Sequence, residues 1–222
     1  MKLIYSSIIA LLSLLPFVSC NCDHEPEMPF KVGWVVCTDG EVMPFCEFIK
    51  SQKIGTALVY YVNPDMTSDI AGYAVYLNDT DPAAFSDGLN QGQGTSTDLY
   101  ALDGNENTYA IYDCEDVGSP LADLVFAMWT YGQSAYVPSV MQLRQVYYVK
   151  DYLNPRLEQI GGDILPDDPD ECWYWSSTEV NGQQEDKSWL FSMQSNAIQE
   201  TPKDQPHKVR PVITIYRGTS YK

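Results

Sequence analysis

The side chains that could carry chemistry in this sequence are mostly carboxylates and amides in two polar segments, residues 163–171 and 181–187. Clustered carboxylates suit a hard cation such as Ca²⁺, but a solvated loop is the simpler interpretation where no calcium motif is present. We therefore predict ligand contacts rather than a metal site in these segments. The candidate ligand-binding residues are Asp167, Asp168, Asp170, Gln183, Gln184 and Asp186.

Histidine occurs only at His24 and His207. A two-histidine zinc site and a Ser-His-Asp triad therefore lack candidate residues. Residues 132–136 resemble a nucleophile elbow, but Tyr136 stands where the second glycine is needed. The glycine-rich residues 88–94 lack the Lys-Ser/Thr pair of a phosphate-binding loop. We predict no catalytic residue and no cofactor, and we expect that the chain is not an enzyme.

Composition limits the number of domains and the partners. The 222 residues, 45% of them apolar, suffice for one substantial core. Thirteen basic against thirty acidic side chains give a net charge of -17, which repels phosphate backbones. The sequence therefore predicts a single globular domain that does not bind nucleic acid.

The first nineteen residues have the features of a signal peptide. Lys2 precedes an apolar run over residues 3–15, and a small Ser19 stands directly before Cys20. This arrangement resembles a bacterial lipobox, with Phe17 in place of the usual leucine. It implies that residues 1–19 are removed and that a lipid on Cys20 anchors the chain in a membrane. An ordinary secreted protein is the alternative.

Residues 20–30 are polar, acidic and proline-containing, which is typical of a solvated tether. Acidic residues directly behind a lipidated cysteine resemble the surface-export signal of Bacteroides-type lipoproteins. The resemblance implies a cell-envelope protein, an outer-membrane lipoprotein that faces the outside. A tether of a periplasm-facing protein is the open alternative. The globular domain is expected over residues 31–222.

Four cysteines follow the tether, at Cys37, Cys46, Cys114 and Cys172. An exported protein can form disulfides but need not do so. Among the three connectivities that four cysteines allow, loop length favours Cys37–Cys46 with Cys114–Cys172. Free buried thiols are the equally open alternative.

The hydrophobic pattern predicts strands, then helices, then strands. The first strands are expected at residues 32–37, 41–48, 56–62 and 72–77, and the last two of these should be sheet neighbours. Residues 78–107 should be irregular. Helices are expected at 120–129 and from Ser139 to about Asn154, with a short one at 155–160. Strands return at 172–178, 188–193 and 208–216. This order indicates an α+β fold with an antiparallel sheet.

Four sequence blocks are similar to the C-terminal domain of Legionella collagen-like proteins. They are YVPSVMQL (136–143), WSSTE (175–179), SWLF (188–191) and VRPV (209–212). Gln142 stands where the family pattern has Glu. The resemblance implies a C-type-lectin-like fold, which is a twisted antiparallel sheet with two main helices and long loops, used mostly for binding.

Trp173 and Trp175 should share one face of an extended segment, and we expect that face to be core rather than a sugar-stacking platform. Arg210 either pairs with Glu179 across the sheet or is solvated. Together these features predict a non-catalytic recognition or adhesion module for a glycan or protein. The alternatives are a structural subunit of a surface assembly and an enzyme on the related fold of formylglycine-generating enzymes.

Overall fold

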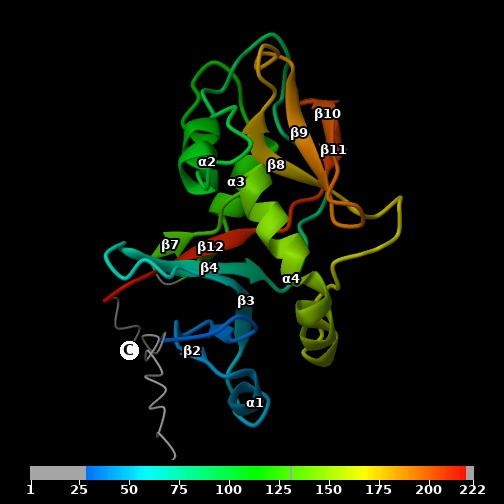
Figure 1. The fold of residues 1–222 in the computed structure, drawn as a ribbon. Helices are drawn as coiled ribbons and strands as arrows, with labels where there is room; N and C mark the ends of the chain where they lie inside the picture. The colour runs from blue at the N-terminus through cyan, green and yellow to red at the C-terminus, as the bar shows by residue number, and fades with distance from the viewer. Residues whose placement is uncertain (1–28, 131, 219–222) are drawn as a thin grey trace, which may run out of the picture.

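The main sheet is built from the β-branched and aromatic segments that the sequence analysis selected. The computed structural model describes residues 29–130 and 132–218 (Figure 1). Cys20, the signal segment and all of the tether except residues 29 and 30 lie outside the described residues. Five antiparallel strands form the sheet in the order β12-β4-β3-β1-β2. Their bounds are β1 (Val35–Cys37), β2 (Val42–Met43), β3 (Gly55–Val62), β4 (Ile70–Tyr76) and β12 (Val212–Tyr216).

The register of this sheet places buried residues opposite one another. Leu58 of β3 lies opposite Val35 on one side and Val75 on the other, and Val212 continues the row. Along β3, Leu58 and Tyr60 belong to one core cluster, whereas Ala57 and Val59 belong to the other. Because successive side chains point to opposite faces, both faces of the sheet are covered.

A second antiparallel sheet, in the order β10-β9-β8, lies beyond the first. Its strands are β8 (Trp173–Glu179), β9 (Lys187–Ser192) and β10 (Ile198–Pro202), and two short ribbons pair β5 (Ala83–Ala84) with β11 (Pro206–His207) and β6 (Trp129–Thr130) with β7 (Gln133–Ser134). Trp175 is fully buried and Trp173 packs against the same core cluster. The expectation that these tryptophans are core residues is confirmed.

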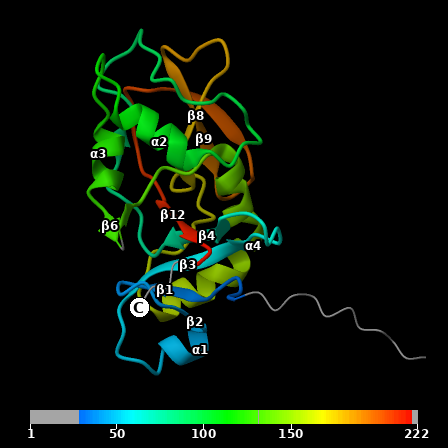
Figure 2. The same cartoon turned by 90° about the vertical axis from the view of Figure 1, so that its left-hand side faces the viewer.

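The described residues contain four helices rather than two main ones. They are α1 (Phe45–Phe48), α2 (Gly104–Tyr112), α3 (Pro120–Phe126) and α4 (Val140–Gln159). Figure 2 shows α2 and α3 alongside the small sheet, and α1 at the opposite end near β1 and β2. The fold is therefore α+β with antiparallel sheets and a majority of strands.

Two predicted segments differ because of single residues. The strand expected at residues 41–48 stops after Met43, because Pro44 leads into α1 instead. The first four residues of α2 fall within residues 78–107, which were predicted to be irregular, since Gly104 and its polar neighbours are weak helix formers. Gly104 is required there because a Cβ atom would lie 2.3 Å from Oε1 of Gln142, which belongs to α4.

The helix α4 starts next to Ser139 as predicted, but it does not end where it was predicted to end. The hydroxyl of Ser139 accepts a hydrogen bond from the Gln142 amide, and the Gln142 side chain accepts one from the Ser139 amide. The predicted stop near Asn154 is wrong, because the helix runs unbroken through Pro155 to Gln159. Leu153 and Leu157 are both fully buried on either side of Pro155, so packing outweighs the proline.

Replacing Pro155 should stabilise the protein. Pro155 is exposed within α4, and Pro155→Ala restores an N–H that can donate to the Asp151 carbonyl. We expect the free energy of unfolding, measured with urea, to rise by about 1–2 kcal/mol after the gain in unfolded-chain entropy is subtracted. The exposed Glu158→Ala should change it by less than about 0.5 kcal/mol. A loss of stability in Pro155→Ala would contradict the continuous helix.

The four described cysteines are free thiols, so neither Cys37–Cys46 nor Cys114–Cys172 is formed, and the open alternative applies. Cys37 is buried in β1, whereas Cys46 is exposed on α1. The sulfur of Cys172 lies 3.3 Å from the Ser192 hydroxyl oxygen. The positions that the strands and helices impose on these thiols explain why short loop length was a poor guide.

Thiol reactivity should follow this burial. Burial, with the carboxylate of Asp39 as a smaller contribution, raises the pKa of Cys37 to about 11, so the unreactive thiol predominates at neutral pH. Iodoacetamide treatment of the native protein near pH 7, followed by peptide mapping, should modify Cys46 and spare Cys37 and Cys172. Equal labelling of Cys37 and Cys46, or a disulfide-linked peptide, would be incompatible with this core.

Candidate functional site

The two candidate loops lie in different parts of the structure and contact different residues. The acidic loop, residues 163–171, joins α4 to β8 and is drawn in yellow in Figure 1. The loop at residues 181–186 joins β8 to β9 at the end of the small sheet. The first contacts α4 and the end of β4, and the second contacts residues 90–91. The sequence predicted both loops but could not place them relative to each other.

A buried arginine anchors the start of the acidic loop. Arg210 is completely buried, and its Nη1 donates to the Leu77 carbonyl at 2.7 Å while its Nη2 donates to the Asp163 carbonyl. Its Nε lies 3.1 Å from Oδ1 of Asp79. The expected pairing of Arg210 with Glu179, and its alternative of a solvated arginine, are both wrong. A guanidinium has five N–H donors in one plane, so a single arginine can contact a carboxylate and two carbonyl groups at the same time.

Asp79 is shared by three further groups at the same junction. Lys208 Nζ lies 3.0 Å from Oδ2 of Asp79, and the Tyr174 hydroxyl donates to the same oxygen at 3.0 Å. Burial raises the pKa of Tyr174, and the carboxylate of Asp79 adds to the effect. The Asp79 amide donates to Asp163 Oδ2 at 2.9 Å. This network ties the loop to β4, β8 and the segment before β12.

The rest of the acidic loop is held against α4. The side-chain amide of Asn154 exchanges two hydrogen bonds with the backbone of Leu165, each 2.9 Å long. Further along, Lys150 Nζ pairs with Oδ1 of Asp167 and donates to the Met193 carbonyl at 2.7 Å. The Lys150 side chain is 7% exposed and that of Asp167 is 72% exposed. A nearly buried cation on the helix therefore fixes an exposed carboxylate of the loop.

An open pocket of about 410 Å³ lies where this loop meets α4. We call it the tyrosine pocket, and it is lined by Tyr147, Tyr148, Lys150, Asp151, Asp167 and Gln194. The rings of Tyr147 and Tyr148 are 5.8 Å apart at an interplanar angle of 67°. Lys150 Nζ lies 5.5 Å from the centre of the Tyr147 ring. Aromatic faces beside acceptor and donor groups suit binding of a small polar molecule.

Among the predicted residues of the acidic loop, only Asp167 lines this pocket. Asp168 instead accepts a hydrogen bond from the Asp170 amide at 2.9 Å, which closes a turn within the loop. Tyr147 and Tyr148 were not among the residues predicted to contact a ligand. The signal was available: adjacent positions on a helix point about 100° apart, so one of two neighbouring tyrosines faces outward.

The second loop is held by its own predicted residues. Asp186 Oδ1 accepts a hydrogen bond from the Asn90 amide at 3.0 Å, and the Gln183 side chain donates to Glu200 at 3.0 Å. The side chain of Gln184 lies against Gly92. Gln183 and Asp186 thus satisfy neighbouring parts of the fold, which reduces what they can offer to a ligand.

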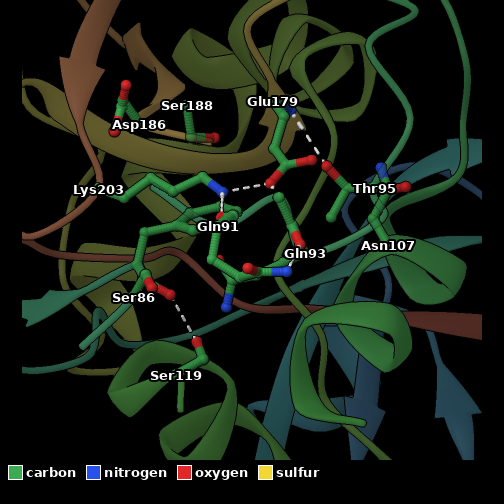
Figure 3. Close-up of polar contacts among 12 residues, drawn as sticks. Ser86, Gln91, Gln93, Thr95, Asn107, Ser119, Glu179, Asp186, Ser188 and Lys203 are labelled. Atoms are coloured by element: carbon green, nitrogen blue, oxygen red, sulfur yellow. Dashed lines mark hydrogen bonds and ion pairs between the residues drawn. The ribbon is translucent and has the colours of Figure 1, made fainter. Parts of the chain in front are cut away.

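Beneath this loop lies a sealed ion pair, drawn in Figure 3. Lys203 Nζ pairs with Oε1 of Glu179, and both side chains are at most 1% exposed. The same Glu179 oxygen accepts a hydrogen bond from the Gln93 amide at 3.0 Å, and Lys203 also donates to the Gln91 carbonyl at 3.2 Å. Because neither side chain is accessible to solvent, the pair joins β8 to the segment after β10 and is not available to a substrate.

Among the described residues, His207 is half-buried against an aromatic ring, and the acidic side chains form no metal-holding group. His207 packs against the Trp175 ring at 5.3 Å between ring centres, and burial lowers its pKa. No group of three or more His, Cys, Asp or Glu side chains in residues 29–130 and 132–218 is arranged to hold a metal ion. Within the same residues, no helix is both long and apolar enough to cross a membrane.

Comparison with known proteins finds a similarity to solved structures and none to a known sequence family. No protein-family model matches the sequence, and no curated protein matches it. Among solved structures, a fimbrial protein from Bacteroides ovatus is similar, with a TM-score of 0.65 and 15% sequence identity over 84% of this chain. The chain shares its fold with that protein. The match covers 49% of the fimbrial protein, so the chain spans about half of its length.

Breaking the sealed ion pair should destabilise the fold far more than breaking a surface pair. Glu179→Gln leaves the Lys203 ammonium buried without its counter-charge, and we expect a loss of about 3–5 kcal/mol in the free energy of unfolding. The exposed pair of Lys187 with Glu200 provides the control, because Glu200→Gln should cost less than about 1 kcal/mol.

The double variant Glu179→Gln, Lys203→Met distinguishes two causes of lost stability. One is the loss of the ion pair itself, and the other is the buried, unpaired ammonium of Lys203. It should regain most of the stability lost by Glu179→Gln, since an apolar side chain then fills the lysine site. If the double variant is as unstable as the single one, the stranded ammonium is not the cause. Urea unfolding of the three variants measures the difference.

Proposed function

We propose that this chain is a lipid-anchored, non-catalytic recognition or adhesion module on a bacterial cell surface. The observation that carries the proposal is the similarity of fold to the Bacteroides ovatus fimbrial protein over 84% of the chain. At 15% identity the similarity concerns the fold, so the role rests on this similarity together with the anchor and the pocket. We include the C-type-lectin-like fold in this proposal, because the four sequence blocks resemble a family whose domains are used mostly for binding.

The described architecture suits a surface module. Both sheets are antiparallel, their cores are closed by α2, α3 and α4, and buried ion pairs hold the long loops in place. Loops held by such contacts present side chains at a rigid surface, which reduces the entropy lost on binding. Formylglycine-generating enzymes need a reactive cysteine pair, and the sequence shows no matching pair motif, which makes that alternative the weakest of the three.

Anchoring through Cys20 would place the domain close to the membrane. Nine residues, 21–29, separate that cysteine from the buried Phe30. At roughly 3.3 Å per residue the tether extends to about 30 Å, enough to hold the domain clear of the lipid headgroups. The net charge of -17 would also keep the domain from adsorbing to anionic headgroups. This geometry suits a module that meets a ligand or a neighbouring subunit outside the membrane.

A structural subunit of a surface assembly is the second candidate function. The observation that favours it is that the similar structure is a fimbrial protein. The two functions differ in partner. Chemical cross-linking on intact cells, followed by mass spectrometry, should join a subunit to copies or neighbours at defined lysines, whereas a solitary module should cross-link only within itself.

The anchor is tested by metabolic labelling with an alkyne fatty acid in a Bacteroides host. The wild-type chain should carry the label, sediment with outer membranes and be cleaved by protease added to intact cells. Cys20→Ala should lose the label and leave the outer-membrane fraction, because no thioether can form. Cys22→Ala is the matched control and should behave as the wild type. An unlabelled wild-type chain, or a labelled Cys20→Ala, would refute the anchor.

A further inference from the structure

We propose that the tyrosine pocket binds a neutral saccharide unit, and this inference rests on the recognition function proposed above. The lining of the pocket includes an exposed aromatic ring next to a second ring that is packed against the core. Tyr148 is 69% exposed, whereas its neighbour Tyr147 is packed edge-on against Phe191 at 6.3 Å between ring centres. An exposed ring next to a fixed one, on a 20-residue helix, is a preformed stacking surface.

The aromatic face selects for the apolar side of a sugar ring. The face of a tyrosine ring carries partial negative charge, and the C–H bonds of one side of a pyranose ring present partial positive charge to it. Stacking of this kind needs neither a formal charge nor a metal ion. It leaves the hydroxyl groups of the sugar at the edge of the ring, where polar side chains can reach them.

The polar side chains of the pocket supply hydrogen-bond partners for hydroxyl groups. No hydrogen bond joins the carboxylate of Asp151 or the side-chain amide of Gln194 to another described residue. Asp167 accepts from Lys150 through Oδ1, so its second oxygen remains available. Lys150 donates to Asp167 and to the Met193 carbonyl, which leaves one of its three protons. Carboxylates and amides pair readily with neighbouring hydroxyls, which both donate and accept.

The charge of the pocket excludes acidic sugars. Asp151 and Asp167 contribute two negative charges against the single positive charge of Lys150, which Asp167 already balances. A uronate or sulfated sugar would therefore meet uncompensated repulsion, increased by the chain's net charge of -17. The volume of about 410 Å³ lies within the range of roughly 300–1,000 Å³ of small-molecule sites. The site thus suits the neutral end of a glycan.

The proposal is tested with the full chain, purified in a detergent that contains no sugar. Binding is measured on an array of neutral glycans and then by calorimetry with the best of them, alongside the matching uronate and choline. We expect at least one neutral glycan to bind more tightly than both charged probes. Tyr148→Ala should weaken that binding by about tenfold, and Asp167→Asn should weaken it to a lesser degree.

Tyr152→Ala is the matched control. Tyr152 is 49% exposed one turn further along α4 and does not line the pocket, since its ring is covered by Arg156 at 3.7 Å. This variant should bind as the wild type does, and circular dichroism should show that both tyrosine variants are folded. The proposal is overturned if no neutral glycan binds, if the uronate or choline binds more tightly, or if Tyr152→Ala and Tyr148→Ala weaken binding equally. None of these outcomes alters the labelling at Cys20, so a failed pocket is distinguishable from a failed anchor.

Discussion

The buried guanidinium of Arg210 is the contact on which the positioning of the candidate site depends. Arg210 lies just before β12. Its guanidinium donates to the Leu77 carbonyl, at the end of β4, and to the carbonyl of Asp163, the first residue of the acidic loop. Asp79 balances its charge, with Lys208 and Tyr174 completing the junction. Because a buried charge without its partners is costly, this junction has one stable arrangement. From this junction the loop runs along α4 to Asp167, which forms an ion pair with Lys150. Both of these residues line the tyrosine pocket.

The sequence predicted those parts of the fold that depend on neighbouring residues, such as helix starts and apolar strands. The hydroxyl of Ser119 accepts from the Ala122 amide and that of Ser139 accepts from the Gln142 amide, as expected of caps before helices. The strands β3 and β4 pair as predicted because both are apolar, β-rich segments. Pro155 was misjudged, since buried leucines on both sides hold the helix together. The strand β10 was missed because three of its five residues are polar and it lies at the edge of its sheet.

Contacts between residues far apart in the sequence determine the ion pairs and the pocket, and these could not be predicted. Arg210 was expected to pair with Glu179 or to be solvated. The observed partners of Glu179 and Arg210 are instead Lys203 and Asp79, which are separated from them by 24 and 131 positions. The candidate loops were recognised from composition, yet of the acidic-loop candidates only Asp167 lines the pocket, whereas Asp168 accepts a hydrogen bond from the Asp170 amide within a turn. Ion pairs that stabilise a fold and carboxylates that meet a ligand look alike in a sequence. Burial and neighbours separate them in the structure, with the Glu179–Lys203 pair sealed and Asp167 at the surface.

We therefore expect that Arg210 holds the acidic loop in place and does not only join the sheets. Hydrogen–deuterium exchange of the Arg210→Lys variant tests this most directly, because lysine keeps the charge beside Asp79 but cannot reach both carbonyls. The amides of Asp163 and Leu165, each 2.9 Å from its acceptor, should exchange faster than in the wild type, while amides of β3 and β4 keep their protection. Unchanged exchange in the loop, or acceleration spread evenly through both sheets, would contradict the claim that this guanidinium positions the site.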